Sequence, residues 1–221
     1  MSTSRSGFFD CPTLAVKVCG ITNPDDVSSA VDAGADAIGI NLFGLSKRYV
    51  ELSHAIEWIE KIPVTRIAVV VNASDSLLDE VSGSGVFDAV QFHGDENPDA
   101  CAKCALPWIR AVRVRSPECL DSALLYDTPW LLLDAYSEQG YGGTGSRVDW
   151  AIAKKFLTEH ATRRITLAGG LNVENVGAAV AAVKPFAVDV ASGVECSANP
   201  RQKDRRLMRD FIRLAKTAAA I

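Results

Sequence analysis

The sequence has no long apolar run and no excess of basic charge. None of its apolar stretches approaches the roughly 18 consecutive residues needed to span a bilayer, and the first ten residues lack the apolar segment of a secretion signal. Lys and Arg total 23 against 27 Asp and Glu, which gives a net charge of −4 and no polyanion-binding character. We therefore expect a soluble, cytoplasmic protein that binds neither membranes nor nucleic acid.

Metal ligands are also scarce. Histidine occurs at positions 54, 93 and 160 only, and Cys101 and Cys104 form a single CxxC pair. A zinc site would normally need a second such pair. The pair also falls within a predicted helix, where thiols more often fill space. We expect no metal site.

Short apolar runs alternate with amphipathic helical segments along the chain, a pattern typical of repeated βα units. Seven helical segments separate eight predicted strands, and an eighth helix, over about residues 203–219, follows the last strand. The helix near residues 117–125 has the weakest pattern. The strands are predicted at residues 14–18, 37–41, 66–71, 89–92, 108–112, 130–134, 165–168 and 187–190.

The length of 221 residues suits one barrel, because single α/β barrels begin at roughly 200 residues. The alternative is an open doubly wound sheet, which usually carries a Gly-x-Gly-x-x-Gly turn after its first strand. Here Cys19-Gly20-Ile21-Thr22 occupies that place. We predict a single-domain (β/α)8 TIM barrel over residues 14–221. Residues 1–13 form an N-terminal extension, either a tail or a cover for the bottom of the barrel.

Polar residues gather at the carboxyl ends of the predicted strands, where α/β barrels carry out their chemistry. Glycine-rich turns follow the last three strands, and such turns can cradle a phosphate. Ordinary left-handed turns are the alternative, but three turns at one rim favour phosphate binding. The polar residues are Cys19, Asn41, Asn72, His93, Arg113 and Asp134, with Arg48 in a loop; the turns are Gly142-Gly143-Thr144-Gly145, Gly169-Gly170 and Ser192-Gly193.

Cys19 and Asp134 are the candidate catalytic groups. Asp134 ends an apolar strand, where desolvation would favour the neutral acid that can donate a proton; an N-cap or salt-bridge role fits equally well. Cys19 either fills space or ionises to a thiolate. Lys17 lies on the same side of its strand and could stabilise that thiolate, although we favour a structural ion pair between Lys17 and Asp189.

Six segments resemble motifs of the phosphoribosylanthranilate isomerase family, in that family's order and spacing, over about residues 17–204. Each motif alone is only suggestive, whereas six in order are highly specific. They are Lys17-Val18-Cys19-Gly20-Ile21-Thr22, Ser46-Lys47-Arg48-Tyr49-Val50, Val90-Gln91-Phe92-His93-Gly94-Asp95, Leu133-Asp134-Ala135 with the 142–145 turn and Asp149-Trp150, Leu167-Ala168-Gly169-Gly170-Leu171-Asn172, and Val188-Asp189-Val190-Ala191-Ser192-Gly193-Val194-Glu195.

The resemblance implies an Amadori rearrangement of N-(5-phosphoribosyl)anthranilate in tryptophan biosynthesis, with no cofactor. It implies that Asp134 is the general acid, that Cys19 is the general base and that Arg48 holds the anthranilate carboxylate. At neutral pH this chemistry favours an acid with a raised pKa and a base with a lowered pKa. The substrate phosphate would be held by Gly143, Gly169, Gly170, Ser192 and Gly193.

Some features depart from the family pattern. The extension of residues 1–13 precedes the usual start, Lys47 replaces a common proline, and Ala191 replaces a frequent serine. Asn199-Pro200-Arg201 occupies a loop that usually contains glycine, and we expect this loop and Ala191 to lie on the phosphate side. None of these changes removes a predicted catalytic residue.

Two other functions remain as alternatives. The chain could be another phosphosugar isomerase or epimerase, or a non-catalytic barrel that binds a phosphosugar. Retention of both Cys19 and Asp134 favours the enzyme. His93, placed on the substrate side of the rim, either orients a catalytic group or only satisfies hydrogen bonds at a strand end, and we favour the second role. The sequence leaves open whether the protein is a monomer or a homodimer.

Overall fold

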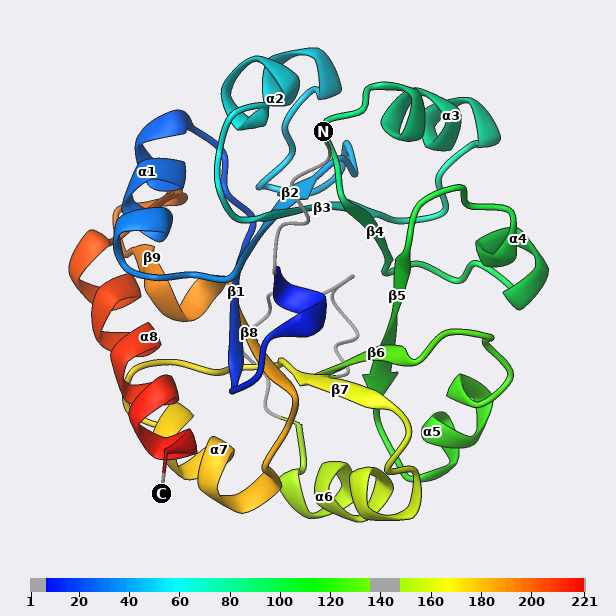
Figure 1. The fold of residues 1–221 in the computed structure, drawn as a ribbon, viewed down its shortest axis with the longest axis vertical. Coiled ribbons are helices and arrows are strands. Elements are labelled where there is room, and N and C mark those ends of the chain that lie inside the picture. Colours follow the sequence, from blue (N-terminus) through cyan, green and yellow to red (C-terminus); the bar gives the residue numbers. More distant parts are fainter. Residues whose placement is uncertain (1–6, 136–147, 221) are drawn as a thin grey trace.

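The fold is a closed barrel of eight parallel strands, described by a computed structural model over residues 7–135 and 148–220 (Figure 1). The strands pair in sequence order, and β1 also pairs with β8, which closes the sheet. The prediction of a (β/α)8 barrel is therefore confirmed. The strands are β1 (Ala15–Cys19), β2 (Ala37–Asn41), β3 (Thr65–Val70), β4 (Ala89–Phe92), β5 (Trp108–Val114), β6 (Trp130–Ala135), β7 (Arg164–Leu167) and β8 (Ala187–Val190).

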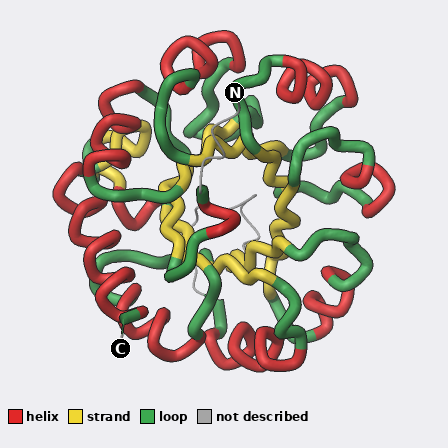
Figure 2. The backbone as a smooth tube through the Cα atoms, viewed as in Figure 1, coloured by secondary structure: helices red, strands yellow, loops and turns green. Residues whose placement is uncertain are grey.

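Helices in the described residues form a ring outside the strands (Figure 2). The segment with the weakest predicted pattern is indeed helical, as α5 (Glu118–Ala123). The others are α1 (Pro24–Asp32), α2 (Leu52–Ile59), α3 (Asp75–Gly83), α4 (Pro98–Ala102), α6 (Trp150–Glu159), α7 (Val176–Val183) and α8 (Arg205–Ala219).

The CxxC prediction was partly wrong. Cys101 is buried within α4, but Cys104 lies beyond the end of that helix. The backbone N–H of Lys103 bonds to Ala100 and that of Cys104 bonds to Cys101, each three residues back, so the helix tightens and ends. The two thiols therefore do not share a helix.

The extension covers the amino-terminal end of the barrel. A short 3-10 helix, η1 (Phe8–Asp10), lies in the middle of the ring of strands in Figure 1. The side chain of Phe8 is fully buried in an apolar cluster of small and large residues, and its backbone N–H donates to Thr65 Oγ1 at 2.9 Å. Four strands begin with an alanine in this cluster, which leaves volume for a phenyl ring: Ala15, Ala37, Ala89 and Ala187.

An aromatic cluster joins the extension to the barrel. The ring of Phe9 lies 4.7 Å from that of Trp130, and Trp130 lies 5.5 Å from Phe186. The Arg164 guanidinium stacks on Phe186, 4.8 Å from the ring centroid. Of the two possibilities for the extension, its described part is therefore a cover, held by packing rather than by a single contact.

A two-stranded antiparallel sheet follows β8 and was not predicted. It consists of β9 (Glu195–Cys196) and β10 (Asn199–Lys203), and it is preceded by the 3-10 helix η2 (Ser192–Val194). We call residues 195–203 the β9–β10 hairpin. It lies between β8 and α8 in the chain, at the carboxyl end of the strands.

Candidate active site

Cys19 is the last residue of β1 and is partly exposed at the rim of the barrel. Lys17, two residues earlier, is fully buried, and its Nζ lies 2.9 Å from Asp189 Oδ1 on β8. The two residues are register partners in the β1–β8 pairing. A Cβ on Gly39 would come within 2.8 Å of Cys19 Sγ and 3.1 Å of Lys17 Nζ, so glycine is needed there. The predicted Lys17–Asp189 ion pair is confirmed.

The pKa of the Cys19 thiol is raised, which contradicts the expected lowered pKa of the base. Burial penalises the thiolate and is the largest cause, and the Lys17 ammonium opposes it without cancelling it. Desolvation alone would lower the pKa of Lys17, but the charges of Asp189 and Cys19 outweigh it and raise that pKa. Lys17 therefore stays charged beside the thiol.

Asp134 lies near the end of β6 and is buried. Its Oδ1 accepts the Ala135 backbone N–H at 2.8 Å, and its Oδ2 lies 3.2 Å from His93 Nε2. The histidine contact is close enough for an ion pair but is not aligned as a hydrogen bond. On the other side of the ring, His93 Nδ1 lies 3.0 Å from Gln91 Nε2. His93 thus contacts the predicted acid, which favours the orienting role over the one we preferred.

Arg48 lies in the loop after β2, and its side chain is buried against Gly20. Gly20 has a φ of +71°, and a Cβ there would come within 2.3 Å of Arg48 Cδ, so only glycine fits beneath the arginine stem. Arg48 Nε donates to Glu195 Oε1, while Arg48 Nη2 is buried without a hydrogen-bond partner among the described residues. A buried guanidinium with an unpaired N–H group can bind a carboxylate.

Three of the predicted rim residues organise loops. Asn41 Oδ1 accepts the Phe43 N–H at 2.9 Å, and Asn72 Oδ1 accepts the Asp95 N–H at 2.8 Å. Arg113 forms an ion pair with Asp95 at 2.5 Å. These contacts shape the loops after β2, β3 and β4 around the rim.

The glycine-rich turn after β7 packs against the end of β6, and the turn after β8 packs against the loop after β7. A Cβ on Gly169 would meet the Ala135 nitrogen at 2.7 Å, and one on Gly193 would meet the Leu171 oxygen at 2.0 Å. Gly170 also has a positive φ, and Ser192 begins η2. Packing between loops accounts for Gly169 and Gly193 without a ligand. Gly143 and the rest of its turn lie outside the described residues.

For some polar residues of the site, no pattern in the sequence indicated which groups they would contact. Lys203 was expected to begin the last helix, but it is the last residue of β10. Its side chain is buried, and its Nζ donates to Ala191 O at 3.0 Å and to Glu195 Oε1 at 3.2 Å. Desolvation lowers the pKa of Lys203, and the Glu195 carboxylate only partly opposes it. Glu195 and Gln91 stood within quoted motifs, yet nothing in the spacing identified their partners.

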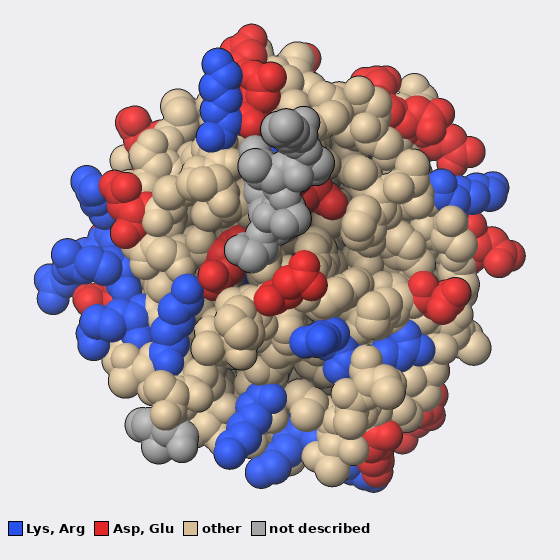
Figure 3. Space-filling view, viewed as in Figure 1, with Lys and Arg blue, Asp and Glu red and all other residues tan. Residues whose placement is uncertain are grey.

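Neither a metal site nor a membrane span is found in the described part of the chain. Over residues 7–135 and 148–220, no three His, Cys, Asp or Glu side chains are placed to hold a metal ion. No helix among these residues has the length and apolar character needed to cross a bilayer. Seen from the side on which η1 lies, acidic and basic side chains are interspersed around the molecule (Figure 3).

Ionisable side chains gathered at one rim of a closed parallel barrel are the arrangement of a (β/α)8-barrel enzyme. The family model for N-(5'-phosphoribosyl)anthranilate (PRA) isomerase matches residues 16–214, and the chain belongs to that family. The curated isomerase of Trichlorobacter lovleyi is 44% identical over 207 residues, covering 93% of this chain and 99% of the relative. That of a Geobacter species is 43% identical over 205 residues, covering 91% and 97%.

Solved structures agree with this assignment. Phosphoribosylanthranilate isomerase from Thermotoga maritima superimposes with a TM-score of 0.84 at 38% identity, covering 92% of this chain and 99% of that one. A phosphoribosylanthranilate isomerase in complex with reduced 1-(o-carboxyphenylamino)-1-deoxyribulose 5-phosphate gives a TM-score of 0.79 at 36% identity, with the same coverage.

Proposed function

We propose that the chain isomerises N-(5-phosphoribosyl)anthranilate to 1-(2-carboxyphenylamino)-1-deoxyribulose 5-phosphate in tryptophan biosynthesis. The observation that carries the proposal is the placement of Cys19 and Asp134 at the carboxyl ends of β1 and β6, with Lys17 beside the thiol and His93 Nε2 3.2 Å from the carboxylate. Related isomerases at above 40% identity, and one complex with a reduced product, support the same substrate.

Asp134 is the general acid of the first step. Its carboxylic acid gives a proton to the ribose ring oxygen while the bond from carbon one to that oxygen breaks. The anthranilate nitrogen supplies the electron pair for a carbon–nitrogen double bond, so the opened sugar is a Schiff base. The carboxylate that remains accepts the Ala135 N–H and faces His93. These contacts stabilise the charge left after proton transfer.

Cys19 is the general base of the second step. Its thiolate removes the proton from carbon two, and the electrons of that bond form a double bond between carbons one and two. The nitrogen takes back its electron pair, which gives an enolamine. This relaxes to the ketone when the oxygen on carbon two loses its proton and carbon one gains one. The reaction needs no oxidant or reductant, because substrate and product are isomers.

The substrate's two anionic ends require separate donors. Arg48 binds the anthranilate carboxylate, because its Nη2 is buried and unpaired. The turns with Gly143, Gly169, Gly170, Ser192 and Gly193 bind the phosphate through backbone N–H groups, and His93 orients Asp134. No cofactor takes part. The protein acts in the cytoplasm as a monomer or a homodimer; the Thermotoga maritima relative is described as dimeric.

Turnover of freshly prepared phosphoribosylanthranilate tests the proposal. The unmodified chain should isomerise it, and Cys19→Ser and Asp134→Asn should each lose at least about 10²-fold in kcat while keeping the fold, because each loses a proton-transfer group. Binding of the substrate without turnover would indicate a phosphosugar-binding barrel instead. Turnover that survives both substitutions would remove Cys19 and Asp134 from the mechanism.

A further inference from the structure

The β9–β10 hairpin contacts the side chain of Arg48 and the backbone of the residues on either side of it. Glu195, at the start of β9, accepts a hydrogen bond from Arg48 Nε. Arg201, on β10, donates from Nη1 to the backbone oxygens of Lys47 and Tyr49, both at 3.0 Å. These carbonyls belong to the residues immediately before and after Arg48. One hairpin therefore holds both the guanidinium and the backbone on either side of it.

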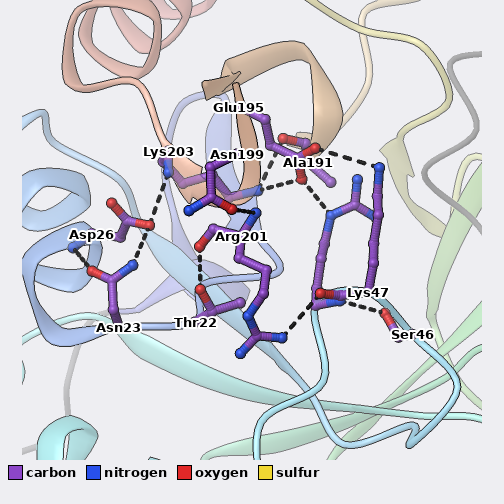
Figure 4. A network of polar contacts seen from close by, with 11 residues as sticks. Thr22, Asn23, Asp26, Ser46, Lys47, Ala191, Glu195, Asn199, Arg201 and Lys203 are labelled. Carbon is purple, nitrogen blue, oxygen red and sulfur yellow. Dashed lines mark hydrogen bonds and ion pairs between the residues drawn. The ribbon is translucent and has the colours of Figure 1, made fainter. Parts of the chain in front are cut away.

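The hairpin is itself anchored to the first βα unit. Thr22 donates its hydroxyl to the Arg201 backbone oxygen, and the Lys203 N–H donates to Asp26 Oδ2 at 2.9 Å. Asn23 holds the same Asp26 oxygen at 2.8 Å. Figure 4 shows Arg201 and Lys203 reaching from the hairpin toward Thr22, Asn23 and Asp26 on one side and toward the Lys47 loop on the other. The loop that carries Arg48 is thus fixed relative to β1 as well as β8.

Charge inside this network favours a fixed Glu195 carboxylate. Desolvation alone would raise the pKa of Glu195, but the hydrogen bond from Arg48 and the Lys203 ammonium outweigh it and lower that pKa. Glu195 therefore stays ionised and keeps Arg48 Nε occupied. The buried and unpaired Nη2 is left to bind a ligand.

We propose that Glu195 and Arg201 are positioning residues that aim Arg48 at the carboxylate of the substrate's aromatic ring. The inference rests on the proposed function, in which Arg48 binds that carboxylate. Arg201 belongs to the Asn199-Pro200-Arg201 segment, which was expected to lie on the phosphate side. The structure places its side chain against the Arg48 loop instead.

Arg201→Ala is the primary test, because Arg201 is exposed and its removal should leave the core intact. We expect KM to rise about tenfold, the equivalent of one charge-assisted hydrogen bond, with kcat changed less than about threefold. Glu195→Gln should act in the same direction. The matched control is Arg205→Ala, which removes an exposed arginine whose ion pair is with Asp32, outside the hairpin. It corrects for the loss of one positive charge and should leave KM unchanged.

Two ligands separate positioning from a general structural effect. One is the reduced product 1-(o-carboxyphenylamino)-1-deoxyribulose 5-phosphate, and the other is the same compound without its ring carboxylate. Arg201→Ala and Glu195→Gln should weaken the first about tenfold and leave the second within about twofold. Equal weakening of both ligands would overturn the inference, since the hairpin would then act on the whole site.

Arg48→Ala distinguishes failure of the inference from failure of the proposed function. If Arg48→Ala weakens the carboxylated ligand but Arg201→Ala and Glu195→Gln do not, Arg48 binds the carboxylate without help and the inference is wrong. If Arg48→Ala also leaves that ligand unaffected, Arg48 does not bind the carboxylate; the inference and the binding role proposed for Arg48 then fail, while the isomerisation itself is still decided by the turnover assay. The double variant Arg48→Ala/Arg201→Ala should bind no more weakly than Arg48→Ala alone, because Arg201 acts through Arg48.

Discussion

Replacing Phe8 by alanine should destabilise the barrel without slowing catalysis. The phenyl ring is fully buried at the bottom of the barrel, in a cluster that holds four alanines at strand starts together with Ile67, Ile109 and Leu132. The substitution therefore leaves a cavity in this cluster.

The magnitude follows from burial and distance. Phe to Ala substitutions in cores cost about 3–5 kcal/mol. For a protein of this size each kcal/mol lowers Tm by roughly 2–4 °C, so Tm should fall by about 6–20 °C. Four residue steps along β1 separate Ala15 from Cys19, roughly 13 Å at about 3.3 Å a step. The proton-transfer groups should therefore keep their geometry.

The assay is thermal unfolding together with steady-state kinetics below the new Tm. Leu125→Ala serves as the control, since Leu125 is 71% exposed and its loss should change stability by less than about 0.5 kcal/mol. A fall in Tm of less than 3 °C for Phe8→Ala would show that the cover is not part of the core. A large drop in kcat with the fold intact would refute the separation of stability and chemistry between the two ends of the barrel.

Further predictions concern the charged groups of the rim. Lys17→Met should cost about 3–5 kcal/mol in urea unfolding because it leaves Asp189 buried without its partner, whereas Lys17→Met/Asp189→Asn should recover most of that loss; equal instability of both would argue against the pair. Because the pKa of Cys19 is raised, kcat/KM should keep increasing with pH beyond the range of an ordinary thiol. In the double variant this rise should move to higher pH, since Lys17 lowers the thiol pKa more than Asp189 raises it; an unmoved profile would remove Cys19 as the titrating base. His93→Gln should lower kcat about tenfold, less than loss of the general acid itself, with the exposed His54→Gln as control; an unchanged kcat would limit His93 to hydrogen bonding at the strand end.

The barrel could be predicted from the sequence because its strands are buried on both faces and read as separate apolar runs. Ala37–Asn41, Ala89–Phe92 and Ala187–Val190 match their predicted bounds, and α1 begins at an Asn-Pro pair typical of a helix start, with the Asn23 side chain accepting the Asp26 N–H at 2.8 Å. The β9–β10 hairpin was missed because its residues are mostly exposed and polar, and their period-two pattern has no apolar face.

The candidate site was predicted as a set of rim positions rather than as a set of contacts. A strand end places Cys19 or Asp134 on the rim, but it does not specify what lies beside it. The lowered pKa expected for Cys19 was wrong because burial outweighs the neighbouring ammonium. The partner of Arg48 lies 147 residues away at Glu195, and no local pattern in a single sequence encodes a contact of that separation.

Pairing of charges explains how this side of the rim can attract an anionic substrate without burying an isolated cation. Lys17 is paired with Asp189, and Lys203 is paired with Glu195, which also holds Arg48. These three buried cations exceed the two carboxylates by one charge, and the half-exposed Lys47 ammonium, 3.8 Å from Glu195, adds another; the unpaired Nη2 of Arg48 is the donor left for a ligand. A lone buried cation would be costly. In the proposed mechanism the carboxylate of the substrate's aromatic ring completes this network at Arg48, and Lys17 beside Cys19 favours the thiolate when the proton on carbon two is removed.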